Sequence, residues 1–96
     1  MIYYYKIVSL ENGALMGVIT SNDFRKYING RAFVAESPKV ANCFIYNNKH
    51  YRAIWMTEAE NVANQHEVVN LFSISEDEYN DFLNPQVEEE NLNENN

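Results

Sequence analysis

The sequence predicts a small α+β domain: a mostly antiparallel sheet of five or six strands, two or three short helices, and an acidic C-terminal tail. Apolar residues make up 46% of the 96 residues, which suits a globular core. Short runs rich in Ile, Val, Tyr and Phe alternate with turn residues, and two Ser/Thr-x-x-Glu sequences resemble helix starts. The length fits one domain, so we expect a folded unit over 1–84 and a tail over 85–96.

The first twenty residues predict a β-hairpin. Residues 2–10 and 14–20 carry β-favouring side chains, and a Glu-Asn-Gly turn lies between them. Alternation along the first run places Tyr3, Tyr5 and Ile7 on one face, which we expect to pack on the core, while the residues between them face solvent.

The next segment predicts a short helix and then a strand. Phe24, Tyr27 and Ile28 recur at helical spacing, polar residues that can cap a helix precede them, and Asn-Gly follows. Residues 31–37 return to a strand pattern, which ends at Ser-Pro.

Residues 40–56 form the clearest hairpin in the sequence. Two β-rich runs flank Asn47 and Asn48, which tolerate the positive φ of a tight turn. A two-residue turn would place Phe44 opposite Tyr51, whereas a three-residue turn would shift the register.

Two capping-box sequences predict the remaining helices. Thr-Glu-Ala-Glu at 57–60 opens one helix, Ser-Glu-Asp-Glu at 75–78 opens another, and residues 67–74 form a strand between them. The apolar phase of each element gives the predicted core, which comprises Ile7, Val18, Val34, Phe44, Ile54, Phe72 and Phe82.

Charge is distributed unevenly along the chain, whose net charge is −7. All seven Lys and Arg residues lie in 1–52 with only three acids, whereas the remainder holds eleven acids and no Lys or Arg. This asymmetry indicates a charged binding surface, an internal electrostatic match, or acids that only aid solubility. We expect the acids of the last helix to bind a protein with a basic surface, and these residues are Glu76, Asp77, Glu78 and Asp81.

Aromatic and basic residues are interleaved in the first half of the chain. Single-stranded nucleic-acid binders use such residues to stack bases and hold phosphates, although aromatics are also ordinary strand residues. Nucleotide or single-stranded nucleic-acid binding is therefore an alternative function. Its predicted patch comprises Tyr4, Lys6, Arg31, Lys49 and Arg52. A further alternative is an oligomer that sequesters a small ligand in a pocket between subunits.

The sequence contains no recognisable catalytic or metal-binding set. Cys43 lies in a strand-like run without the glycines or helix start that would expose and activate a thiol. His50 and His66 lack metal-ligand spacing, and the three glycines form no phosphate-binding loop. We therefore expect no enzyme activity, no cofactor and no metal.

These features together predict a small non-enzymatic protein-binding module. Its size and acidity resemble the small inhibitors that phages and mobile elements direct against host or defence proteins. No run approaches roughly 18 apolar residues, no signal peptide is evident, and a single cysteine fits a reducing cytoplasm, so we expect a cytoplasmic protein without membrane contact. Because small sheets have edges that need covering, we also expect a homodimer paired through 2–10 or 40–56.

Overall fold

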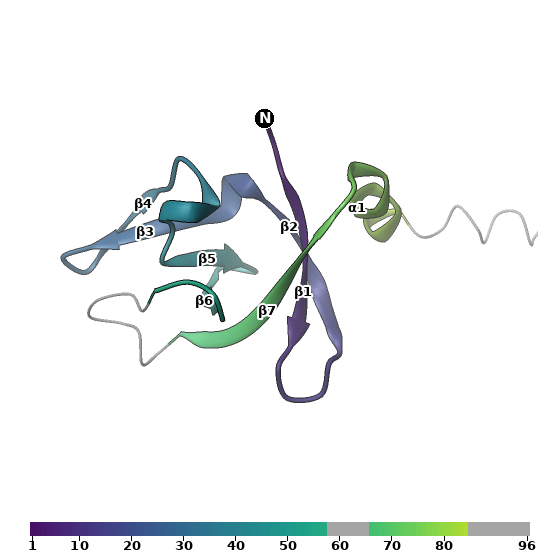
Figure 1. The fold of residues 1–96 in the computed structure, drawn as a ribbon, viewed down its shortest axis with the longest axis horizontal. Helices are drawn as coiled ribbons and strands as arrows, with labels where there is room; N and C mark the ends of the chain where they lie inside the picture. The colour runs from purple at the N-terminus through teal and green to yellow at the C-terminus, as the bar shows by residue number, and fades with distance from the viewer. Residues whose placement is uncertain (58–65, 85–96) are drawn as a thin grey trace, which may run out of the picture.

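The computed structural model describes residues 1–57 and 66–84, and these form one curled sheet of seven strands with a helix at one end (Figure 1). The strands are β1 (Tyr4–Ser9), β2 (Leu15–Thr20), β3 (Phe24–Ile28), β4 (Arg31–Val34), β5 (Cys43–Tyr46), β6 (Lys49–Ala53) and β7 (Glu67–Ile74). The other elements are the helix α1 (Glu76–Leu83) and two 3-10 turns, η1 (Ser21–Asp23) and η2 (Pro38–Val40). Within the sheet the strands lie in the order β2-β1-β7-β6-β5-β3-β4.

The predicted α+β domain with five or six mostly antiparallel strands is therefore wrong. The sheet has seven strands, and it is mixed because β6 and β7 run parallel while the other neighbouring pairs are antiparallel. In the part of the chain that the structure describes, α1 is the one α-helix, whereas two or three were expected. The helix predicted to start at 57–60 runs into residues outside that part, and the tail predicted over 85–96 lies outside it entirely.

Both predicted hairpins are confirmed. β1 and β2 pair antiparallel, and so do β5 and β6. Asn47 and Asn48 adopt φ values of 53° and 62°, as a two-residue turn that matches the strand twist requires. This turn places Phe44 opposite Tyr51, and their rings stack with centroids 5.7 Å apart.

The predicted helix at 20–30 is instead the strand β3. Thr20 and Asp23 do form the capping box of a helix start, but it closes only the single turn η1. The Asn-Gly that was expected to stop a helix has φ values of 53° and 80° and turns β3 into β4. Phe24 faces the core, while Tyr27 packs on the opposite face of the sheet. Because β3 carries large side chains on both faces, their spacing in the sequence resembles that of a helix.

The last strand and helix are confirmed. β7 lies inside the sheet between β1 and β6, antiparallel to β1 and parallel to β6. At the start of α1 the Ser75 hydroxyl accepts a hydrogen bond from the Glu78 N–H at 3.1 Å, and the Glu78 carboxylate accepts one from the Ser75 N–H at 3.2 Å. This reciprocal pair is the capping box that the sequence predicted.

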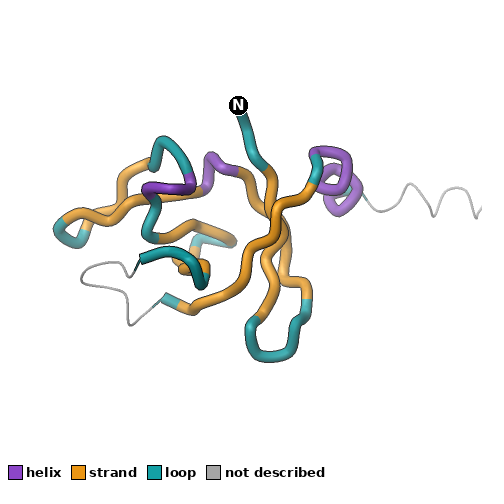
Figure 2. Tube along the Cα trace, viewed as in Figure 1, coloured by secondary structure: helices purple, strands orange, loops and turns teal. Residues whose placement is uncertain are grey.

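The strands curve round rather than lie flat (Figure 2), and side chains join β5 to β2, although β6, β7 and β1 lie between them in the strand order. The Tyr46 hydroxyl on β5 donates a hydrogen bond to the Met16 carbonyl on β2 at 3.0 Å. Gly17 makes this approach possible, because a Cβ at that position would overlap the Tyr46 ring.

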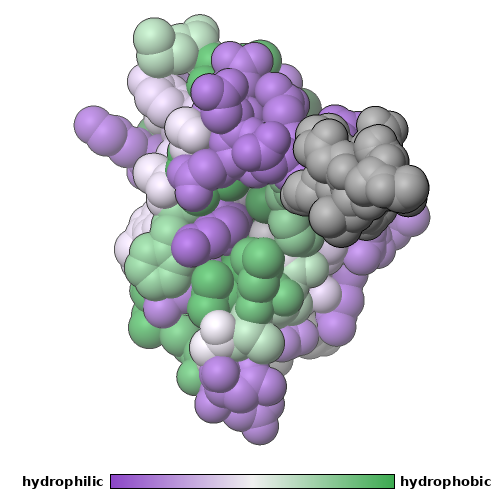
Figure 3. Space-filling view, turned by 90° about the vertical axis from the view of Figure 1, so that its right-hand side faces the viewer, coloured by the Kyte–Doolittle hydropathy of each residue, from purple (hydrophilic) through white to green (hydrophobic). Residues whose placement is uncertain are grey.

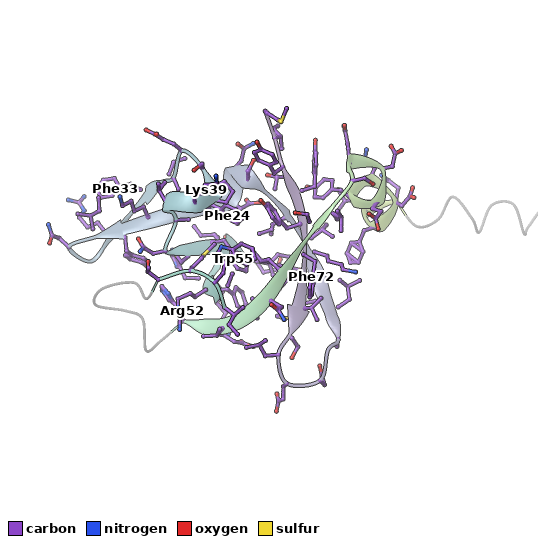
Figure 4. All side chains as sticks on the ribbon, in the orientation of Figure 1. Phe24, Phe33, Lys39, Arg52, Trp55 and Phe72 are labelled. Atoms are coloured by element: carbon purple, nitrogen blue, oxygen red, sulfur yellow. The ribbon has the colours of Figure 1, made fainter. Side chains whose placement is uncertain are left out.

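The core fills the inner face of this curl. Phe24 and Phe44 are completely buried and meet edge to face with ring centroids 6.1 Å apart, and Phe24 lies in the interior in Figure 4. The remaining buried apolar residues of the cluster are Ile7, Ile19, Ala35, Ala41, Tyr51, Ala53, Met56, Val69 and Leu71.

The predicted core is correct at Ile7 and Phe44 only, both of which are 0% exposed. The other five predicted core residues are half-buried or exposed, and these are Val18, Val34, Ile54, Phe72 and Phe82. Val34 belongs to the edge strand β4, and Ile54 follows β6. In β2 and β7 the prediction assigned the wrong set of alternate residues to the core, because both strands carry apolar residues on both faces. Gly17, Ile19, Val69 and Leu71 face the core, whereas Val18 and Phe72 alternate with them on the outer face.

Replacing Phe44 with alanine should lower the free energy of unfolding by about 3–5 kcal/mol, because a fully buried ring would leave a cavity. Phe82→Ala should cost less than about 2 kcal/mol, because that side chain is already 41% exposed. Urea denaturation followed by circular dichroism measures both. Equal losses for the two variants would contradict this placement of the core.

Gly17→Ala should destabilise the protein by about 1–3 kcal/mol, because the new methyl group overlaps the Tyr46 ring. In a Tyr46→Ala background the same change should be nearly neutral, since the obstacle is gone. A double-mutant cycle by urea denaturation measures the coupling. Additive effects would mean that β5 and β2 are not in contact.

Candidate functional site

A groove of about 620 Å³ lies between α1 and the outer face of β1, β2 and β7. It is lined by Lys6, Leu15, Val18, Ile74, Glu78, Asp81 and Phe82. Figure 3 faces this end of the molecule and shows hydrophobic residues directly beside hydrophilic ones. The groove therefore combines an apolar floor with an acidic wall.

Packing on β1 fixes the position of α1. The Tyr79 ring on the helix contacts the Tyr4 ring on β1 with centroids 5.0 Å apart. Phe82 follows Tyr79 by three residues and so projects from the same side of the helix, where it lines the groove. Lys6 lines the floor, and its ammonium lies over the ring of its cross-strand neighbour Phe72, 5.9 Å from the ring centroid.

The four acids predicted to bind a partner are all exposed on α1. Glu78 and Asp81 form the groove wall, whereas Glu76 and Asp77 lie in the first helical turn and do not line the groove. Over residues 1–57 and 66–84 the one ion pair joins Lys49 to Glu67 at 3.6 Å, so no acid of α1 is paired with a described basic residue. These carboxylates are available to a basic ligand.

The structure disperses the alternative aromatic and basic patch. Tyr4 and Lys6 are near neighbours on β1, where Tyr4 packs under α1. Lys49 and Arg52 lie on β6, where Lys49 pairs with Glu67 and Arg52 donates a hydrogen bond to the Met56 carbonyl at 3.1 Å. Arg31 begins β4 at the edge of the sheet, and four strands separate β4 from β1.

A ring cluster that the sequence pattern does not predict lies on the outer face of β3 and β6. The imidazoles of His50 and His66 stack with centroids 5.8 Å apart, and Tyr27 packs on each of them at 5.4 Å. His50 Nε2 and His66 Nδ1 are buried and have no hydrogen-bond partner among residues 1–57 and 66–84. Burial, followed by the nearby His50 and Arg52, lowers the pKa of His66 below its ordinary value. The spacing 27, 50 and 66 has no sequence period, so only strand register reveals the cluster.

The Cys43 thiol and possible metal ligands are the remaining candidates for chemistry. Cys43 is fully buried, and burial raises the pKa of its thiol to about 11, although Arg25 acts in the opposite direction. The thiol is therefore protonated at neutral pH. In the described ranges, no group of three or more His, Cys, Asp or Glu side chains could hold a metal ion.

Comparison with known proteins adds no template for this site: no family model, curated protein or solved structure matches the chain. Among the described helices, none is both long and apolar enough to cross a membrane.

Lowering the pH from about 7.5 to 5.5 should destabilise the protein through His66. The folded state holds the pKa of His66 below 6.5, so the unfolded chain binds the proton more readily. Stability is therefore lost as the pH falls below 6.5, and the loss levels off once folded His66 is also protonated. His66→Phe keeps a ring at the site and should reduce this loss. Identical pH profiles of the urea midpoint for both proteins would exclude His66 as its source.

Proposed function

We propose that this chain is a small non-enzymatic protein-binding module whose groove under α1 takes a basic segment with an apolar face. The observation that carries the proposal is the groove itself, where exposed apolar side chains adjoin carboxylates that form no ion pair with a described basic residue. Leu15 and Phe82 line the groove and are 51% and 41% exposed. Apolar surface rimmed by polar residues is typical of protein interaction sites.

The charges of the groove favour a basic partner. Glu78 and Asp81 would meet lysine or arginine side chains at the wall, while Glu76 and Asp77 extend the negative field beyond it. Such a field speeds association and disfavours acidic competitors. Lys6 carries the opposite charge on the floor, where its ammonium can donate a hydrogen bond to a carbonyl of the partner's backbone.

The role that we propose for such a module is inhibition. An acidic surface that covers a basic surface of its target blocks whatever that surface normally binds, and a row of carboxylates can imitate a phosphate backbone. The small size and net charge of −7 support an inhibitor of a host or defence protein, encoded by a phage or mobile element.

A fluorescent amphipathic peptide of lysine and leucine provides a defined probe for the groove. The double variant Glu78→Lys, Asp81→Lys should weaken its binding at least about tenfold and flatten the salt dependence, because both wall charges are reversed. Phe82→Ser should weaken binding without changing the salt dependence. Fluorescence anisotropy between low and high salt measures both effects.

Two further variants act as controls. Glu11→Lys reverses an exposed acid in the β1–β2 loop, outside the groove lining, and should bind the peptide nearly as wild type does. Deletion of 86–96 separates the tail charges from those of α1. If the double variant binds like wild type at both salt concentrations, the acidic groove is not the interface.

A further inference from the structure

The end of the molecule opposite α1 is a wing formed by residues 24–40, which comprise the β3–β4 hairpin and η2 (Figure 1). β4 is the outermost strand of the sheet, and all four of its residues are exposed. The homodimer was expected to pair through 2–10 or 40–56, but β1, β5 and β6 each have neighbours on both sides. The open strand edges of the described sheet belong to β2 and β4.

The hydrogen bonds of β4 leave a row of backbone groups pointing outward. The Ala35 N–H bonds to the Phe24 carbonyl on β3 at 3.0 Å. Because inward and outward groups alternate along an antiparallel strand, Phe33 also faces β3, whereas Ala32 and Val34 direct their N–H and C=O away from it. An edge of this kind is a template for another strand.

The edge of β2 differs from that of β4. The pairing of β2 with β1 shifts register at Met16, and the carbonyl of this residue already accepts the hydrogen bond of the Tyr46 hydroxyl. The curl of the sheet thus covers part of the β2 edge, while β4 projects on the wing. β4 is therefore the edge that can accept an added strand.

Apolar side chains beside this edge can receive side chains of an added strand. Phe33 and Val34 are 49% and 69% exposed, and Figure 4 shows Phe33 far out on the wing. A pocket of about 260 Å³ adjoins them, and it is lined by Lys26, Ile28, Phe33, Val34, Ala35, Glu36 and Val40. In strand addition, backbone hydrogen bonds supply affinity and such pockets supply specificity.

Charge identifies the chemistry of the occupant. The wing carries four of the seven basic residues of the chain and a single acid, Glu36. The four are Arg25, Lys26, Arg31 and Lys39. None of them forms an ion pair with another described residue. A second copy pairing β4 with β4 would bring these like charges together, whereas an acidic segment would neutralise them.

We propose that the outer edge of β4 binds an extended acidic segment of a partner protein as an eighth strand. Ala32 and Val34 supply the backbone hydrogen bonds, the pocket beside Phe33 takes an apolar side chain, and Lys26 and Arg31 meet the acids. This site lies at the other end of the molecule from the groove under α1, has the opposite charge, and does not depend on that groove.

The probe is a fluorescent ten-residue peptide that alternates glutamate with valine and threonine. Wild type should bind it, and a matched peptide with lysine for glutamate should bind at least about tenfold more weakly. A third peptide, with N-methylated amides at alternate residues, should not bind, because it cannot complete the backbone hydrogen bonds to β4. In hydrogen exchange, the acidic peptide should protect the amides of Ala32 and Val34.

Variants of the wing test the same contacts. Val34→Pro removes an outward N–H without removing a bond to β3 and should abolish binding, while Val34→Thr keeps that N–H and should bind normally. Lys26→Glu with Arg31→Glu should abolish binding of the acidic peptide and provides a test that does not rely on proline. Glu78→Lys with Asp81→Lys should leave it unchanged, which separates this site from the groove.

Three results would overturn the proposal. One is equal binding of the acidic peptide by wild type and the charge-reversed variant. Another is that wild type binds single-stranded oligothymidylate more tightly than the peptide and that the charge-reversed variant loses this binding. That result would assign the wing to nucleic acid. The third is a dimer by light scattering that Val34→Pro dissociates, which would assign the edge to a second copy.

Discussion

The contact of Tyr46 with β2 determines the shape of this protein. A flat sheet of seven strands would leave its apolar face open to water, because one helix cannot cover it. Curling the sheet until the Tyr46 ring lies on Gly17 encloses that face, so that the sheet acts as its own second layer. The fully buried Phe24 and Phe44 meet within the enclosure. The curl does not cover the outer face of β1, β2 and β7, and α1 covers that face incompletely.

The fold turns the charge asymmetry of the sequence into a spatial one. Four basic residues fall in the β3–β4 hairpin and η2 at one end, while α1 places four acids at the other. Strand order, rather than distance along the chain, holds the two groups apart, because α1 follows β7 directly and two strands, β6 and β5, separate β7 from the β3–β4 hairpin. Each end also exposes apolar side chains, so each combines a charge of one sign with hydrophobic surface.

Local chemistry was predictable from the sequence, and long-range pairing was not. The Asn47–Asn48 turn and the Ser75 capping box are built by residues adjacent in the chain, so their patterns were read correctly. The helical spacing around Tyr27 misled because that strand packs on both faces, which periodicity cannot distinguish from a helix. The acids of α1 were found, but the groove was not, because its floor joins residues from β1, β2 and β7.

The position of β7 sets the order in which the molecule can be assembled. Tyr4 pairs with Ile74, so the first strand made has one of its two neighbours seventy residues away. Until residues 67–74 emerge from the ribosome, the β1–β2 hairpin and the β3–β6 strands have nothing between them to join their edges. The nascent chain thus carries two partial sheets with exposed apolar faces, and long-range closure of this kind is slow. A truncation that removes β7 would leave β1 and β6 without their shared neighbour, so that side-chain contacts such as that of Tyr46 with β2 would have to hold the two partial sheets together.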